Sequence, residues 1–93
     1  MADDALTLRV FTHPACGGCG AAVKAAWQLH QAHPALLLRT VSLDSKAGLD
    51  EAHAEGITTI PTTILSRGSR EVARWVGAIS PGALETAFME ATG

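Results

Sequence analysis

The only two cysteines of this 93-residue chain form the motif Cys16-Gly17-Gly18-Cys19. Residues 6–11, directly before the motif, are rich in β-branched and aromatic side chains, which predicts a short strand. Residues 20–33 contain no proline and predict a helix, because Val23, Ala26, Trp27 and His30 recur at helical spacing. The motif therefore lies where a strand runs into a helix, and this junction restricts the fold more than any other feature of the sequence.

Further strands and helices follow from the same kinds of pattern. Pro34 ends the first helix, because proline disfavours helical geometry at the residue before it. Pro61 cannot donate to a strand ladder, so it is expected to begin a strand or to lie at a bend. The order β-α-β-α-β-β-α indicates an α/β fold, in which the first helix supplies a right-handed crossover between parallel strands. The elements predicted after Pro34 are a strand at residues 35–43, a helix at residues 46–55 capped by Asp44 or Ser45, strands at residues 61–66 and 70–76, and a helix that starts at Pro81.

Composition and charge limit the classes of partner. With 47% apolar and 17% charged residues the chain is expected to be globular, and its length allows one domain, residues 1–93, with residues 1–5 as a flexible tail. A formal net charge of −2 gives no support for binding nucleic acid or an anionic membrane. No apolar run reaches transmembrane length, and Asp3 and Asp4 stand where a secretory signal would carry basic residues. We therefore expect a cytoplasmic protein that acts as a monomer.

The cysteine pair by itself has three uses. At the start of a helix the dipole stabilises a Cys16 thiolate, whereas Cys19, one turn further in, is more covered and close enough to form a disulfide with Cys16. In a reducing compartment such a pair is more often catalytic or metal-binding than structural. On the motif alone, a reversible dithiol, a metal site and a structural disulfide all stay open.

Four features follow one another along the chain, each occurring once. A strand precedes the cysteine motif, the motif opens a helix, an Ile-Pro-Thr stretch begins a later strand, and a Val-Gly-Ala stretch follows the next one. Together they resemble the thioredoxin superfamily over nearly the whole chain, as a compact member of glutaredoxin size. The resemblance implies a thioredoxin-like fold: a four-stranded mixed sheet in the order 2-1-3-4, flanked by three helices. Besides the motif, the residues that carry the resemblance are Gly56, Ile57, Ile60, Pro61, Thr62, Val76, Gly77, Ala78, Ser80 and Leu84.

The resemblance also implies roles for individual residues. Cys16 would be the nucleophile, Cys19 the resolving thiol, and Pro61 a cis-proline packed against the disulfide. An extended substrate segment would be recognised mainly by backbone pairing and apolar contact, which tolerates varied sequences. The residues expected to bind that segment are Ile60, Thr62, Gly77 and Ala78.

Several positions depart from the thioredoxin pattern. Val10 stands where a buried carboxylate is expected, Ala15 replaces a tryptophan, and Gly17-Gly18 replaces glycine-proline. The sequence therefore lacks the carboxylate that the resemblance would assign to the proton of the resolving thiol. His13 is a candidate for this role because imidazole titrates near neutrality, although a histidine here can equally be a solvated loop residue. The Gly-Gly-Asp with which glutaredoxins bind glutathione is replaced by Gly77-Ala78-Ile79.

The motif and the resemblance together predict a thiol–disulfide oxidoreductase that works through a mixed disulfide. The expected substrates are protein disulfides, the expected electron donor is a thioredoxin reductase or glutathione, and no cofactor is expected. The alternatives are a metal or iron–sulfur binding module and a redox-sensing adaptor. In a metal module, ligands would have to come from a second chain or from added thiols, because His30, His33 and His53 are predicted to lie too far from the motif.

Overall fold

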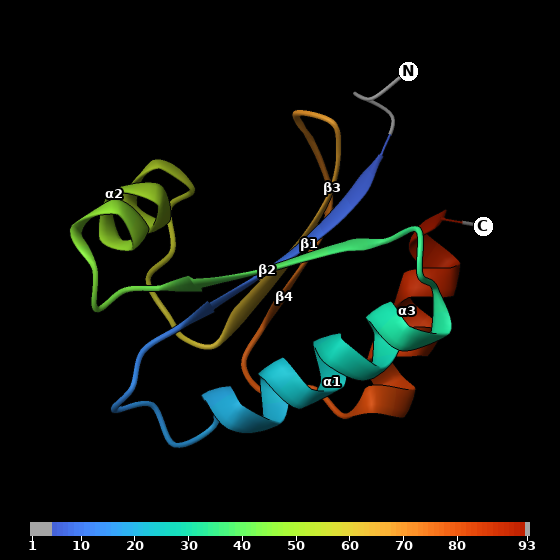
Figure 1. Ribbon diagram of the computed structural model, residues 1–93, viewed down its shortest axis with the longest axis horizontal. Helices are drawn as coiled ribbons and strands as arrows, with labels where there is room; N and C mark the ends of the chain where they lie inside the picture. The colour runs from blue at the N-terminus through green and yellow to red at the C-terminus, as the bar shows by residue number, and fades with distance from the viewer. Residues whose placement is uncertain (1–4, 93) are drawn as a thin grey trace.

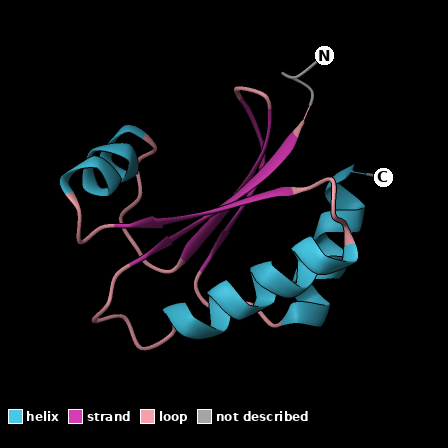
Figure 2. Cartoon of the chain, in the orientation of Figure 1, coloured by secondary structure: helices cyan, strands magenta, loops and turns pink. Residues whose placement is uncertain are grey.

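The computed structural model describes residues 5–92, which form four strands and three helices (Figures 1 and 2). The predicted order β-α-β-α-β-β-α is confirmed. The predicted tail, residues 1–5, lies outside the described residues except for Ala5. None of the helices within residues 5–92 is long and apolar enough to cross a membrane. The elements are β1 (Leu6–Thr12), α1 (Cys19–Ala32), β2 (Leu37–Ser42), α2 (Lys46–Ala54), β3 (Thr62–Arg67), β4 (Arg70–Val76) and α3 (Pro81–Thr92).

β1 lies in the interior of the sheet, between β2 and β3. It runs parallel to β2 and antiparallel to β3, and β4 pairs antiparallel with β3. The parallel pair is connected through α1, because a tight turn cannot join parallel strands. The antiparallel pair β3–β4 is a hairpin whose turn contains Gly68 at a φ of 61°, a conformation that favours glycine. The predicted mixed sheet and its order, β2-β1-β3-β4, are confirmed.

α1 and α3 cover one face of the sheet, at the lower right of Figure 1. Leu8, Val10 and Leu65 of the strands are fully buried there and pack with Leu84 and Phe88 of α3. α1 turns mainly small side chains toward this cluster, which allows the helix to lie close to the sheet. The buried residues of α1 are Cys19, Ala22, Ala25, Ala26 and Leu29.

α2 lies on the opposite face, at the left of Figure 1. Phe11, Val41 and Ile64 of the three neighbouring strands form a second buried cluster there with Ala52 of α2 and with Ile57, which follows the helix. The side chains of β1 thus alternate between the two clusters, as expected for a strand that is covered on both faces.

The start of α2 is fixed by a close approach to β2. Gly48 is buried against the end of that strand, where a Cβ would lie 1.8 Å from the carbonyl oxygen of Ser42. The helix begins with Ser45 as its N-cap, whose hydroxyl accepts a hydrogen bond from the Gly48 N–H at 3.0 Å. Of the two caps predicted from the sequence, Ser45 is therefore the one used.

Several large apolar side chains are exposed at the surface. Trp27, assigned to the packing stripe of the first helix, is 51% exposed and stacks on His30, because the alanines of α1 face the sheet instead. Val76 is 64% exposed because it lies on the face that α2 covers only in part. Its neighbour Trp75 is half-buried and packs against the cluster of α1 and α3. β2 is an edge strand, and its Leu37 is 53% exposed.

Candidate active site

The cysteine motif lies in the loop between β1 and α1, where a disulfide joins Cys16 and Cys19 with their Cα atoms 5.5 Å apart. A turn leads into it, in which the Cys16 N–H donates to the carbonyl oxygen of His13 at 2.9 Å. α1 begins at Cys19 with Gly18 as its N-cap, so Cys16 lies ahead of the helix and not in its first turn. Cys19 is only 4% exposed, whereas Cys16 is half-buried. Cys16 is therefore the more accessible of the two cysteines.

Two further loops meet the motif at Pro61 and Ala78. The Ile60–Pro61 peptide bond is cis, and Pro61 is buried directly before β3. The carbonyl oxygen of Pro61 accepts a hydrogen bond from the Gly77 N–H at 2.7 Å, which ties the loop before β3 to the loop after β4. A Cβ on Gly18 would lie 3.8 Å from both Pro61 Cδ and Ala78 Cβ. Three loops that are distant in sequence thus come together at Gly18 of the cysteine motif.

The four residues predicted to bind substrate differ in how far they are exposed to solvent. Ala78 is exposed, Ile60 is half-buried, and Gly77 has a φ of 91°, which favours glycine. Thr62 does not reach the surface, because it is 2% exposed on an interior strand and its hydroxyl donates to the Thr59 carbonyl oxygen. Val76 was not among the residues predicted to bind substrate. Its side chain is largely exposed next to Gly77. The only indication in the sequence that Val76 lies near the cysteine motif was its position directly before Gly77 and Ala78.

Solved structures with the same arrangement are known, although no family model and no curated protein sequence matches the chain. Thioredoxin O2 from Arabidopsis thaliana, in its oxidized state, matches with a TM-score of 0.82 and 18% identity over 94% of this chain and 75% of that one. Mitochondrial thioredoxin 3 from Saccharomyces cerevisiae, in its oxidized form, matches with a TM-score of 0.80 and 24% identity over 96% and 81%. The chain has the thioredoxin fold. Thioredoxin-2 of the malaria parasite matches similarly, with a TM-score of 0.82 and 21% identity over 92% and 82%.

Within this thioredoxin fold, the buried side of the motif is apolar. Val10 of β1 is fully buried in the cluster beneath α1 and α3. A valine cannot accept a proton, so this position lacks the proton-handling group that the thioredoxin pattern led us to expect.

His13 lies in the loop directly before the motif and is half-buried. Its Nδ1 accepts a hydrogen bond from the Ala15 N–H at 3.0 Å, so the neutral ring carries its proton on Nε2. Taking up a second proton would cost Nδ1 this hydrogen bond. The geometry therefore gives His13 a part in shaping the turn before Cys16, and the expected role as proton acceptor competes with that part.

The three segments that meet at the disulfide carry no formal charge. Residues 10–23, 56–66 and 75–84 contain no Asp, Glu, Lys or Arg, and His13 is their only histidine. Clefts lined by charges of one sign attract oppositely charged partners over long distances. These three segments contain no formally charged side chain that could create such a field.

The other three histidines are used elsewhere. Nδ1 of His30 lies 2.6 Å from the Leu36 carbonyl oxygen, His33 stacks on a phenylalanine of α3, and His53 is exposed on α2. Within residues 5–92, no three side chains of Cys, His, Asp or Glu gather closely enough to hold a metal ion. A metal held by the cysteine pair would therefore need ligands from outside residues 5–92.

Proposed function

We propose that this chain is a thiol–disulfide oxidoreductase. The observation that carries the proposal is the pairing of a half-buried Cys16 with a covered Cys19, next to Pro61 and the Gly77-Ala78 loop. An accessible thiolate can attack a disulfide in a second molecule, and a covered neighbouring thiol can then resolve the product. The thioredoxin fold supports the proposal, because the similar thioredoxins include proteins solved in the oxidized state.

The reaction has two exchange steps. The Cys16 thiolate attacks one sulfur of a substrate disulfide, which forms a mixed disulfide and releases the first substrate thiolate. Cys19 loses its proton and attacks the Cys16 sulfur, which closes the disulfide within the motif and releases the second substrate thiolate. The two electrons of the dithiol pass to the substrate, and a thioredoxin reductase or glutathione must return them for another turnover.

The groove beside the disulfide is assigned to an extended segment of the substrate. The backbone at Ile60 would offer an edge for pairing, and Val76 and Ala78 would supply apolar contact. Pro61 would separate this edge from the sulfurs, and Gly77 would leave room for the segment. The side chain of Thr62 has no part in the groove, because it is buried.

Protein disulfides fit this groove better than mixed disulfides of glutathione. Glutathione carries a carboxylate at each end, and the three segments around the disulfide contain no Lys or Arg that could pair with them. A neutral extended segment of a protein needs only backbone hydrogen bonds and apolar contact. Glutathione stays a candidate electron donor, and one of the similar structures concerns the resolving of a yeast mitochondrial 1-Cys peroxiredoxin via glutathione/thioredoxin systems.

Turnover of a small disulfide-bonded protein tests the proposal, with either thioredoxin reductase and NADPH or glutathione as the donor. Cys19→Ser should accumulate a mixed disulfide with the substrate on non-reducing gels, because Cys16 can attack but the product is not resolved. Cys16→Ser should trap far less. A reversed trapping pattern would exchange the roles of the two cysteines, and no turnover with either donor would contradict the function.

A further inference from the structure

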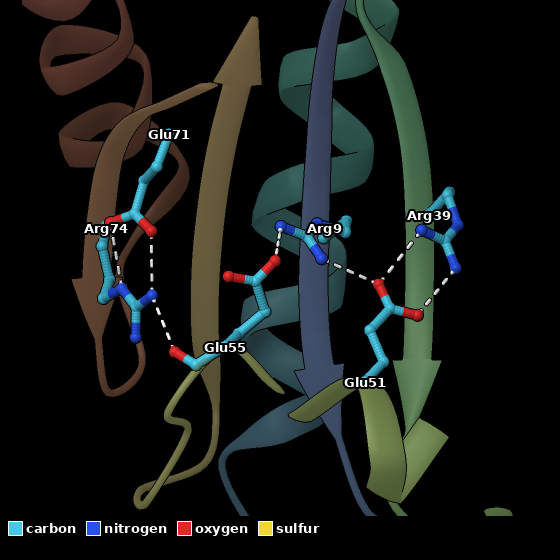
Figure 3. A network of polar contacts seen from close by, with 6 residues as sticks. All are labelled: Arg9, Arg39, Glu51, Glu55, Glu71 and Arg74. Atoms are coloured by element: carbon cyan, nitrogen blue, oxygen red, sulfur yellow. Dashed lines mark hydrogen bonds and ion pairs between the residues drawn. The ribbon is translucent and has the colours of Figure 1, made fainter. Parts of the chain in front are cut away.

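Three arginines stand in one row across the sheet, on the face that carries α2 (Figure 3). Strand pairing places Arg39 of β2 beside Arg9 of β1, Arg9 beside Ile64 of β3, and Ile64 beside Arg74 of β4. Paired residues of neighbouring strands share a face of the sheet. Because Ile64 belongs to the cluster under α2, the arginines border that cluster on both sides of Ile64.

Two of these arginines hold the body of α2. Arg9 donates to Glu51 at 2.8 Å and to Glu55 at 2.6 Å, and Arg39 donates to both carboxylate oxygens of Glu51, at 3.0 and 3.2 Å. Burial alone would lower the pKa of Arg9, but its hydrogen bonds with Glu51 and Glu55 outweigh burial and raise it. All of these contacts end on side chains of α2 and its cap, and none reaches the backbone of the loop that follows.

Arg74 makes a contact of a different kind. Its Nη2 donates to the backbone carbonyl oxygen of Glu55, the C-cap residue of α2, at 3.0 Å. The unpaired carbonyl groups at a helix C-terminus carry partial negative charge, so a cation there is favourable. Glu71 holds the same guanidinium through bonds of 2.8 and 3.1 Å, and this hydrogen bonding raises the pKa of Arg74. Arg74 is therefore a charged donor aimed at the point where the helix ends.

The loop that leaves Glu55 is tied to β4 and its continuation at both ends. Arg74 holds its start, and Gly77 holds its end through the 2.7 Å hydrogen bond to the Pro61 carbonyl oxygen. Between the two ties, Ile57 is buried in the cluster under α2. The loop ends at the cis-proline Pro61, which lies next to Gly18 of the cysteine motif. The conformation of the loop therefore determines the position of Ile60 and Pro61 on one side of the proposed groove.

We propose that Arg74 is a positioning residue for the substrate groove. By holding the Glu55 carbonyl group it sets where residues 56–60 leave α2, and with that the placement of Pro61 opposite the Gly77-Ala78 loop. The role rests on the proposed function, because the groove matters only if an extended substrate binds in it. Arg74 forms no hydrogen bond with either cysteine, so its effect falls on substrate binding and not on the reactivity of Cys16.

The test compares Arg74→Gln with two matched variants. Arg39→Gln removes an arginine of the same row that binds only Glu51, and Glu71→Gln removes the charge partner while leaving Arg74 able to donate to the Glu55 carbonyl oxygen. Three quantities are measured for each: KM and kcat for reduction of a small disulfide-bonded protein, the rate at which iodoacetamide alkylates reduced Cys16, and amide hydrogen exchange in residues 57–60.

Arg74→Gln should raise KM about two- to tenfold, the effect of losing one hydrogen bond, and should speed exchange in residues 57–60. Its kcat and its alkylation rate should stay within about twofold of the parent, as should the KM of both matched variants. An unchanged KM, or an equal rise in Arg39→Gln, would overturn the proposal. If Arg74→Gln does not fold, Arg74→Lys takes its place, with a smaller rise in KM expected.

The two proposals can fail separately. If the parent protein reduces no disulfide, the proposed function is wrong. Exchange in residues 57–60 then decides alone whether Arg74 holds the loop: faster exchange in Arg74→Gln than in Arg39→Gln supports this, and equal exchange contradicts it.

Discussion

Cys16 and Cys19 differ in their surroundings although they lie in one short loop. Cys16 is half-buried ahead of α1, whereas Cys19 is 4% exposed inside the first turn. In the reduced protein, Cys16 should be alkylated faster than Cys19 and at lower pH, because a covered thiol is harder to ionise and to reach. Mass spectrometry of the alkylated peptides across a pH series measures both rates. Equal rates at every pH would contradict the proposed polarity of the pair.

Two substitutions of His13, by asparagine and by alanine, distinguish a role in shaping the turn from a role as proton acceptor. Asparagine at this position can still accept the Ala15 N–H but does not titrate, whereas alanine does neither. If His13 acts by shaping the turn, His13→Asn should keep the rate of mixed-disulfide breakdown and His13→Ala should lower it. If His13 accepts the proton, both variants should be slow below about pH 8. Stopped-flow measurement across pH decides, and a parental rate in both variants would remove His13 from the mechanism.

At the scale of single elements, the packing of α2 against β2 requires glycine at position 48. Gly48→Ala should destabilise the protein by roughly 2 kcal/mol or more, because its Cβ would fall 1.8 Å from the Ser42 carbonyl oxygen and the helix would have to move. Gly20→Ala in α1 is the control. No atom lies within 4 Å of its added Cβ, so it should stabilise by about 0.5 to 1 kcal/mol. Urea denaturation measures both changes, and a neutral Gly48→Ala would show that α2 shifts freely.

α2 is also the element whose attachment should weaken in acid. Hydrogen bonds from Arg39 and Arg9 lower the pKa of Glu51 from its ordinary value of 4.5. A carboxyl group whose pKa is lowered by folding stabilises the protein above its unfolded pKa, and this contribution is lost as the pH falls through the folded pKa. The thermal midpoint should therefore drop below pH 4.5, and less steeply in Glu51→Gln than in the parent. Parallel curves for the two proteins would show that Glu51 contributes nothing to this acid dependence.

At the scale of the whole molecule, residues 10–23, 56–66 and 75–84, which include the cysteine motif and its neighbouring loops, contain no Asp, Glu, Lys or Arg. The ratio kcat/KM for a protein disulfide should therefore change less than about twofold between about 0.01 M and 1 M salt, because screening acts on charged encounters. Ala78→Lys places a charge at the exposed rim and serves as the control. With an acidic substrate protein, only this variant should lose activity as salt rises. Strong salt dependence in the parent would mean that distant charges steer the encounter.

The elements of the fold could be predicted from the sequence because their signals are local. Proline after His33, the Ser45 cap and the periodicity of each segment act within a few residues, and all seven elements form where these signals place them. The burial of α1 was harder to predict. Its contact face consists mainly of alanines, whereas the larger Trp27 is exposed, and size alone does not reveal which side of a helix meets the sheet.

By itself, the sequence determined the cysteine motif at a strand-to-helix junction, the order of the elements and the uncharged segments around the motif, because each is a property of neighbouring residues. Only the tertiary structure decided that Thr62 is buried, that Gly18 faces Pro61 and Ala78, and that three arginines form one row against α2. These features depend on strand register and on which face each helix covers, and both are set by packing between segments distant in sequence.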